Sequence, residues 1–346
     1  MQKQGLKIPL SRRENAVLLS LTGLLVLAAL GSLLVGRFNL SPAMLLKVFR
    51  ARLTGKDPVP QADNIIFIIR LPRIFLAMLV GAALSLSGAA YQSLFKDPLV
   101  SPGVLGVTSG AGFGAALGIL FSLPSVVIQS FAFIFGLITV AAVLSLTQFA
   151  GKGRNSTVIL ILTGTIMNAL FSSVISFTKY VADADNKLPE ITFWLMGSFA
   201  RSGNNKNVLI MLGVLLVAGT VLFLLRWKIN ILSFSDEEAR SMGVNTRQVR
   251  TVVILASTLL TAASVSLCGI ISWVGLIIPH IARLLVGPNN QALFPVSLLG
   301  GALFMLLVDN CARALIPGEL PVGVLVSFIG APLFLYMLFC GKKEWL

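Results

Sequence analysis

Long apolar runs separated by short polar stretches recur along almost the entire chain. All but one of them reach the roughly 18 residues at which a run becomes a candidate bilayer-spanning helix. The pattern therefore predicts an all-α, polytopic membrane protein with about ten transmembrane helices in a single domain, residues 1–346. The ten expected spans cover residues 15–36, 74–95, 104–121, 125–149, 157–179, 207–226, 251–271, 274–287, 293–311 and 321–340.

Two polar segments are too long to be simple turns. Residues 37–73 contain Pro42, Pro58 and Pro60, and we expect them to form an external loop. Residues 227–250 lie on the opposite side of the expected topology, in the cytoplasm.

The cytoplasmic segment carries its own helix signals. Ser235 precedes three acidic residues, and this is a helix start because the hydroxyl caps free N–H groups and anions favour the positive end of the helix dipole. Gly243, followed by Asn245 and Thr246, ends that helix and starts another. We predict a short helix, a turn and a second short helix, which form either a docking surface or an ordinary connecting loop.

The composition excludes a soluble globule. Of the 346 residues, 56% are hydrophobic and only 12% are charged, and the mean hydropathy is +0.91. An ordinary soluble domain has about 25% charged residues. The amino end lacks an evident small-residue cleavage site, so the first apolar run is expected to be a span and not a cleaved signal peptide.

The net charge of +14 comes from 27 Lys and Arg against 13 Asp and Glu. Such a surplus can indicate nucleic acid, but here the cations flank apolar runs, as the positive-inside rule describes. With ten spans both termini share one side, and the cations between Lys3 and Arg13 place it in the cytoplasm. Fifteen cations then fall inside and 12 outside. Given this weak bias, either the topology is wrong or the outer face keeps cations for another reason, such as docking of an acidic partner.

Small residues are frequent within the spans. Several of the 31 glycines recur at three- and four-residue spacings near residues 81–88 and 103–118. In membrane helices this spacing favours close helix packing, and a smooth pore lining is the alternative. The three cysteines lack metal-ligand spacing and are interpreted as packing residues: Cys268, Cys311 and Cys340.

Motifs of catalysis and nucleotide binding are absent from the sequence. No Walker A phosphate loop, metal cluster or catalytic set occurs, and the one histidine, His280, is interpreted as a packing residue. Ionisable residues within spans are few, unlike in many ion-driven pumps. The chain is therefore expected not to be an enzyme and to take its energy from a source other than an ion gradient.

Several blocks resemble the permease subunits of type II ABC importers, the FecCD-like group that carries iron–siderophore, haem and cobalamin. They begin with "RLPR" at 70–73 and "GAALSLSGAAYQSLFKDPLVSPGVLGVTSGAGFGA" at 81–115. They continue with "WLMGSF" at 194–199, "EARSMGVNTRQVR" at 238–250 and "GIISWVGLIIPHIARLLVG" at 269–287. The last two are "DNCAR" at 309–313 and "ELPVGVLVSFIGAPLFLYML" at 319–338, so the likeness covers nearly the whole chain.

The resemblance implies a set of partners. These are a second copy of the chain, with a homodimeric translocation path, two separate ATP-binding cassette subunits, and a periplasmic or lipid-anchored substrate-binding protein. No nucleic acid is expected. No cofactor is expected in this chain, because ATP and Mg would bind the ATPase. The implied location is the bacterial inner membrane, multi-pass, with both termini cytoplasmic.

The resemblance also assigns roles to residues. In the cobalamin relative of this family, three arginines meet glutamates of the binding protein, and the matching residues here are Arg70, Arg73 and Arg313. Alternatively, Arg70 and Arg73 anchor the second span, and Arg313 pairs with Asp309. The ATPase-coupling contact would comprise Glu238, Ala239, Arg240, Met242, Gly243 and Val244. The cytoplasmic gate would comprise Asp97, Leu99, Thr157 and Val158. Asp97 and Val158 depart from the family pattern, and Asp97 could instead cap a helix.

The expected function is ATP-driven import of a metal chelate, haem or corrinoid by alternating access. The same type of importer carrying an oxyanion such as molybdate is an alternative. A secondary transporter is a less favoured one, and a membrane enzyme is disfavoured by the missing catalytic set.

Overall fold

The computed structural model describes residues 11–36, 38, 40–55, 60–150, 156–201, 203–316 and 318–340, without the side chains of residues 156, 157, 338 and 340. All regular structure in these residues is helical, as the apolar pattern predicts. The helices are α1 (Arg12–Ser32), α2 (Pro42–Thr54), α3 (Pro60–Asn64), the π-helical η1 (Ile65–Arg70), α4 (Leu71–Phe95), the 3₁₀ turn η2 (Pro102–Leu105), α5 (Val107–Leu120), α6 (Ser125–Ala150), α7 (Ser156–Val181), α8 (Lys187–Leu195), α9 (Asn205–Ile231), α10 (Asp236–Ser241), α11 (Thr246–Cys268), α12 (Val274–Val286), α13 (Asn290–Ala314) and α14 (Val322–Cys340).

Seven helical stretches in the described residues are long and apolar enough to cross a membrane. They are α1, the continuous stretch Pro60–Phe95, α6, α7, α9, α11 and α13. Shorter apolar helices, α5, α12 and α14, occupy the three other expected positions. A polytopic membrane architecture is confirmed, and ten full spans stay a prediction.

The expected external loop is largely helical. Residues 37–73 contain α2, α3 and η1, and the second spanning helix starts at Pro60, well before the expected residue 74. The π turn keeps the backbone continuous, since the N–H of Leu71 donates to the carbonyl of Ile66. The helix that contains the expected span thus begins earlier than the span itself, and the structure buries both Arg70 and Arg73 within it.

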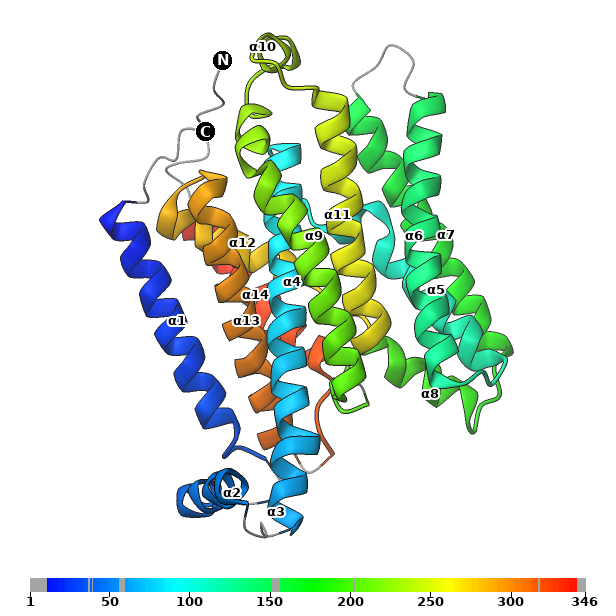
Figure 1. Cartoon of the computed structure of the whole chain (residues 1–346). Helices are drawn as coiled ribbons and strands as arrows, with labels where there is room; N and C mark the ends of the chain where they lie inside the picture. The colour runs from blue at the N-terminus through cyan, green and yellow to red at the C-terminus, as the bar shows by residue number, and fades with distance from the viewer. Residues whose placement is uncertain are drawn as a thin grey trace.

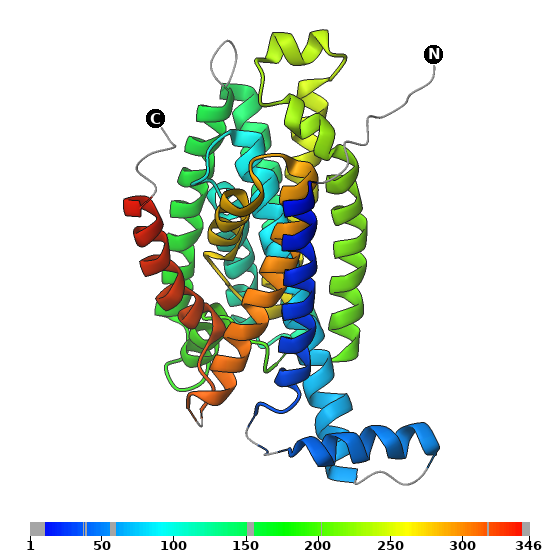
Figure 2. The ribbon, with the colours of Figure 1, turned by 90° about the vertical axis from the view of Figure 1, so that its left-hand side faces the viewer.

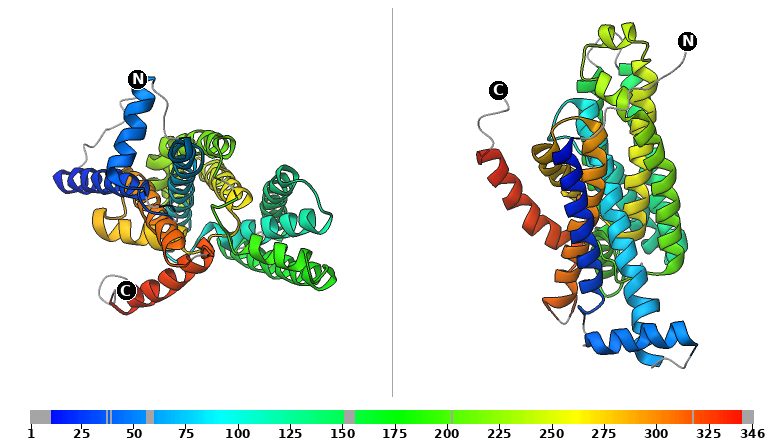
Figure 3. Two further views of the ribbon diagram at one scale, coloured as in Figure 1. Left: turned by 90° about the horizontal axis from the view of Figure 1, so that it is seen from below. Right: turned by 60° about the vertical axis from the view of Figure 1, so that its left-hand side comes forward.

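The bundle has two distinct ends. In Figure 1, α10 stands at the top, while α2, α3 and α8 lie at the bottom. The start of α1 and the end of α14 both point toward the α10 end, which Figure 2 shows from the side. Seen from below in Figure 3, α1 and α2 form one flank and α6 and α7 the other, with α4 between them.

Helix α4 is the core of the bundle and packs against α9, α11, α12 and α13. Every residue from Val80 to Gln92 is buried. At Gly81 and Gly88 a Cβ atom would overlap the backbone carbonyls of Gly301 in α13 and Gly275 in α12. Close helix packing is therefore confirmed at these glycines, where backbones meet directly.

Candidate functional site

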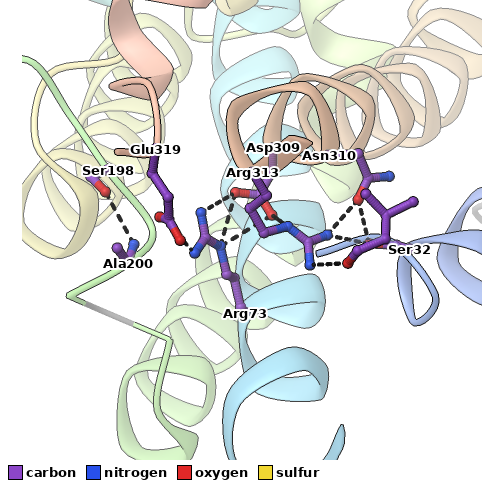
Figure 4. Close-up of polar contacts among 9 residues, drawn as sticks. Ser32, Arg73, Ser198, Ala200, Asp309, Asn310, Arg313 and Glu319 are labelled. Carbon is purple, nitrogen blue, oxygen red and sulfur yellow. Dashed lines mark hydrogen bonds and ion pairs between the residues drawn. The ribbon is translucent and has the colours of Figure 1, made fainter. Parts of the chain in front are cut away.

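The three arginines with a proposed docking role lie together near the α2–α3 end. Arg73 binds Asp309 with two nitrogens, Nε at 3.0 Å and Nη2 at 2.9 Å from Oδ1, and its Nη1 donates to Glu319 Oε2 at 3.0 Å. Arg313 Nε lies 3.1 Å from Asp309 Oδ2. Figure 4 shows Asp309 between the two guanidinium groups, with Glu319 on the far side of Arg73. The predicted pairing of Arg313 with Asp309 is confirmed.

The remaining contacts tie this cluster to the end of α1. Arg313 Nη2 donates to Ser32 Oγ at 2.6 Å and also to Asn310 Oδ1, and Arg313 Nη1 donates to the carbonyl of Val35 at 3.1 Å. Arg70 donates to the carbonyls of Leu33 and Phe38. The cluster thus joins α1, α4 and α13.

Burial makes these ion pairs energetically demanding. The Asp309 side chain has no exposed surface, and the side chains of Arg73 and Arg313 are 8% and 5% exposed. Charges removed from water need close partners to recover the lost hydration. The structure supplies them from distant parts of the chain, so the cluster fixes how α4, α13 and the segment before α14 meet.

This geometry changes the expectation for docking. The guanidinium groups of Arg70, Arg73 and Arg313 point into the chain's own carboxylates and carbonyls. Glu319, whose side chain is 23% exposed, is the more accessible of the two carboxylates in the cluster. Binding of an acidic partner by these arginines stays a prediction. Sequence reasoning missed Glu319 and Ser32, since neither carries a local signal of a contact with a distant arginine.

The segment between α9 and α11 begins with a capping box at α10. Glu238 N–H donates to Ser235 Oγ at 3.3 Å, and Ser235 N–H donates to Glu238 Oε2 at 2.9 Å. Hydrogen bonds from the backbone and hydroxyl of Ser235 lower the pKa of the Glu238 carboxyl. The expected helix and turn are confirmed. The second helix, however, is not short but forms the first turns of the long α11.

The six expected coupling residues divide into two groups. Ala239 and Val244 are buried and anchor the segment. The others are exposed: Glu238, Arg240, Met242 and Gly243. Gly243 has φ +79°, in the left-handed region that favours glycine. The segment is therefore a rigid, charged and partly apolar projection, and its role in ATPase coupling stays a prediction.

Two of the expected gate residues, Asp97 and Leu99, follow α4, and the other two, Thr157 and Val158, lie in the first turn of α7. Asp97 Oδ1 accepts from the N–H of Leu99 at 2.8 Å, which closes a turn and does not cap a helix. Leu99 and Val158 are 50% and 54% exposed. The side chain of Thr157 lies outside the described residues. The structure does not assign a gate to these residues, so it stays a prediction.

The described residues contain no group of three His, Cys, Asp or Glu side chains that could hold a metal ion. Cys268 is buried, in line with a packing role, whereas Cys311 is exposed, so packing within one chain is wrong for it. The side chain of Cys340 lies outside the described residues. His280 is buried with its ring 6.4 Å from that of Phe334, as expected of a packing residue.

Comparison with known proteins agrees with a polytopic membrane bundle. The family model described as the FecCD transport family matches residues 24–339. The molybdate import system permease protein MolB of Haemophilus influenzae is 43% identical over 327 residues, covering 94% of this chain and 96% of that protein. A probable iron chelatin transport system permease protein of Helicobacter pylori is 42% identical over 277 residues, covering 80% and 82%.

A solved structure of a metal-chelate type ABC transporter in an inward-facing conformation superposes with a TM-score of 0.84. It is 41% identical in sequence, covering 94% of this chain and 99% of that chain. The class defined by fold and sequence is a membrane permease of the ABC importer type. The chain belongs to the FecCD transport family, and the resemblance found in its motifs is confirmed.

Proposed function

We propose that the chain is the membrane-spanning subunit of an ATP-driven importer and works as a homodimer with two ATPase subunits and a substrate-binding protein. The observation that carries this proposal is the α10 segment, a rigid exposed projection at the opposite end of the bundle from the arginine cluster (Figure 1). The permease relatives support the same assignment. The α10 end would face the cytoplasm of a bacterium, with the chain in the inner membrane.

In this proposal α10 and the turn at Gly243 sit in a cleft of the ATPase subunit. Movement of the ATPase upon ATP binding would be transmitted through the buried anchors Ala239 and Val244 into α11. Lys96 at the end of α4 donates to the carbonyl of Phe234 at 2.9 Å, so the same movement would also reach the core helix. The gate residues Asp97 and Leu99 follow directly after Lys96, and this position supports their assignment at the inner mouth.

The opposite end would receive the binding protein. A carboxylate of the binding protein would take the place of Glu319, the accessible partner of Arg73. Arginine suits this role because its planar fork binds carboxylates in pairs. Docking would therefore replace ion pairs within the chain by ion pairs with carboxylates of the binding protein.

The proposed substrate is a metal chelate of the iron–siderophore, haem or cobalamin kind. Relatives named for iron chelatin and the metal-chelate type transporter support it. Molybdate is the second candidate, because a relative that matches 94% of the chain is named for molybdate. Selectivity would reside largely in the binding protein.

The two candidates are distinguished by uptake in vesicles containing the complete complex and ATP. Radiolabelled ferric siderophore and radiolabelled molybdate are offered separately with the cognate binding protein. Uptake of the iron chelate alone supports the first candidate. Uptake of molybdate alone replaces it by the second, and uptake of neither rejects both molybdate and ferric siderophore.

A further inference from the structure

Arg283, near the end of α12, differs from the arginines of the cluster at the opposite end. Its guanidinium is half-buried, and its Nε is fully shielded from solvent with no hydrogen-bond acceptor among the described residues. No carboxylate of the described residues forms an ion pair with it. A buried N–H without an acceptor is costly, and an anion at this site would supply one.

Two open pockets meet at Arg283. The first, of about 360 Å³, lies between the ends of α4 and α9 and the start of α13, and it also contains Lys96. Its wall is a connected set of amides, in which Asn230 Nδ2 donates to Asn289 Oδ1 and Asn290 Nδ2 donates to Asn230 Oδ1, both at 2.8 Å. These hydrogen bonds hold the wall in place. Arg283 and Lys96 line the same pocket, where Lys96 also donates to the carbonyl of Phe234.

The second pocket, of about 460 Å³, lies between the start of α1 and the end of α12. Arg13 supplies a further cation. Glu14 also lines it, but its carboxylate accepts from the N–H of Ser11 at 2.6 Å in the capping box of α1. Arg283 thus borders both pockets, with Lys96 in the first and Arg13 in the second, and the one carboxylate that lines them, Glu14, is already engaged.

The surface beside the pockets is apolar. Leu284 and Leu285, which follow Arg283 and line the second pocket, are 52% and 39% exposed. Neighbouring α1 exposes Leu19 and Leu24 on a helix that buries almost nothing within the chain. A cationic pocket at the end of a membrane helix, bordered by exposed leucines, fits a molecule with an anionic head and acyl chains.

We propose that Arg283, with Lys96 and Arg13, binds the phosphate group of an anionic membrane phospholipid, whose acyl chains lie over Leu284 and Leu285. Arg283 bonds the phosphate oxygens with its planar fork, and the lysine and second arginine add charge. This lipid would link α1, α4, α9, α12 and α13 at the α10 end. The proposal rests on the membrane setting alone and stands independently of the ATPase and of the substrate.

The test is native mass spectrometry of the full chain purified in detergent. Dioleoylphosphatidylglycerol is titrated against dioleoylglycerol, which has the same chains without phosphate, and against inorganic phosphate. We expect tight binding of the phospholipid alone. Arg283→Gln should weaken it about tenfold, as expected for loss of a charge-assisted hydrogen bond of about 1.4 kcal/mol.

Two further variants keep the test decisive if Arg283→Gln does not fold. Arg13→Gln changes an exposed side chain that lines the pocket, and it should also weaken phospholipid binding. Lys228→Gln, the matched control, removes an exposed cation at the same end but outside both pockets and should leave binding unchanged. The proposal would be overturned if dioleoylglycerol bound as tightly as the phospholipid or if millimolar phosphate competed with the phospholipid. It would also be overturned if Lys228→Gln and Arg13→Gln lost phospholipid affinity equally.

Discussion

Asp309 shows how one residue holds distant parts of the chain together. It pairs with Arg73, 236 positions away in sequence, and with Arg313 one helical turn later. Both arginines are buried, so each depends on this carboxylate to compensate for lost hydration. The local i,i+4 pair could be predicted from sequence. The distant one could not, because no periodicity relates residue 73 to residue 309.

Replacing Asp309 by Asn should destabilise the protein strongly. The variant keeps the side-chain volume but leaves the buried Arg313 without an anion and Arg73 with Glu319 alone, and breaking a buried pair typically costs about 3–5 kcal/mol. Thermal unfolding in detergent measures the effect. The control is Asp63→Asn, which removes the exposed pair with Arg52 and should cost less than about 1 kcal/mol. Equal effects of the two variants would contradict a structural role for the buried cluster.

Replacing Glu319 by Gln should strengthen docking of the substrate-binding protein. The change removes the charge with which Glu319 holds Arg73 Nη1, so a partner's carboxylate displaces the neutral amide more easily, while Asp309 continues to hold the other nitrogens. We expect the affinity to rise about fivefold, the equivalent of about 1 kcal/mol for one hydrogen bond. Binding to the full chain in nanodiscs is measured by surface plasmon resonance.

The matched control for charge alone is Glu190→Gln on α8, an exposed carboxylate at the same end of the bundle. It should leave the affinity almost unchanged. An unaltered affinity in Glu319→Gln, or equal gains in both variants, would contradict the exchange of Glu319 for a partner's carboxylate.

At the level of elements, the long apolar helices were predictable and the short ones were not. The runs at α6, α7 and α9 are continuous and clearly bounded, so their positions agree with expectation. Helices α2 and α8 are short, carry polar residues and lie outside the long spans, so the lengths of the apolar runs alone did not predict them. The segment around α10 was predictable because capping and turn residues are local signals.

The backbone contact at Gly88 predicts a packing defect upon substitution. Gly88→Ala should place a Cβ against the carbonyl of Gly275 and cost about 1–3 kcal/mol, as overpacking does. Gly213→Ala in α9 is the control, since nothing lies near its added methyl group. Melting temperatures in detergent report both. A Gly88→Ala protein as stable as Gly213→Ala would show that α4 and α12 do not meet this closely.

The turn after α10 predicts a separation of ATP hydrolysis from transport. Gly243→Val places a β-branched residue at φ +79°, a strain of about 1–3 kcal/mol that should reshape the projection. In vesicles with the ATPase subunits, ATP hydrolysis should continue while substrate uptake falls strongly.

Gly55→Val provides the comparison for strain alone. Gly55 has φ +65° and open space around it, but it ends α2 at the opposite end of the bundle. Uptake should be retained in this variant. Full uptake by Gly243→Val would place ATPase coupling elsewhere.

At the scale of the whole molecule, α4 connects the two functional ends. Arg73 near its start belongs to the arginine cluster, and Lys96 at its end contacts the turn before α10. Between them the helix is buried against four neighbours. Its central position could not be predicted from sequence, because the helices it meets are distant in the chain and small residues do not specify which partner they face.

The class of the molecule was the most predictable property, since long motif blocks occur in order along nearly the whole chain. Substrate identity was the least predictable, because the relatives that share these blocks carry different names, for molybdate and for iron chelatin. Their common sequence specifies the bundle and its contacts more than the cargo.

The energy source is the most direct test of the proposed importer. Uptake of the substrate held by the binding protein is measured in vesicles that contain either the chain alone or the chain with its ATPase subunits. We predict uptake only with the ATPase and ATP, and none by the chain alone under a proton or sodium gradient. Gradient-driven uptake by the chain alone would contradict ATP-driven import and identify a secondary transporter.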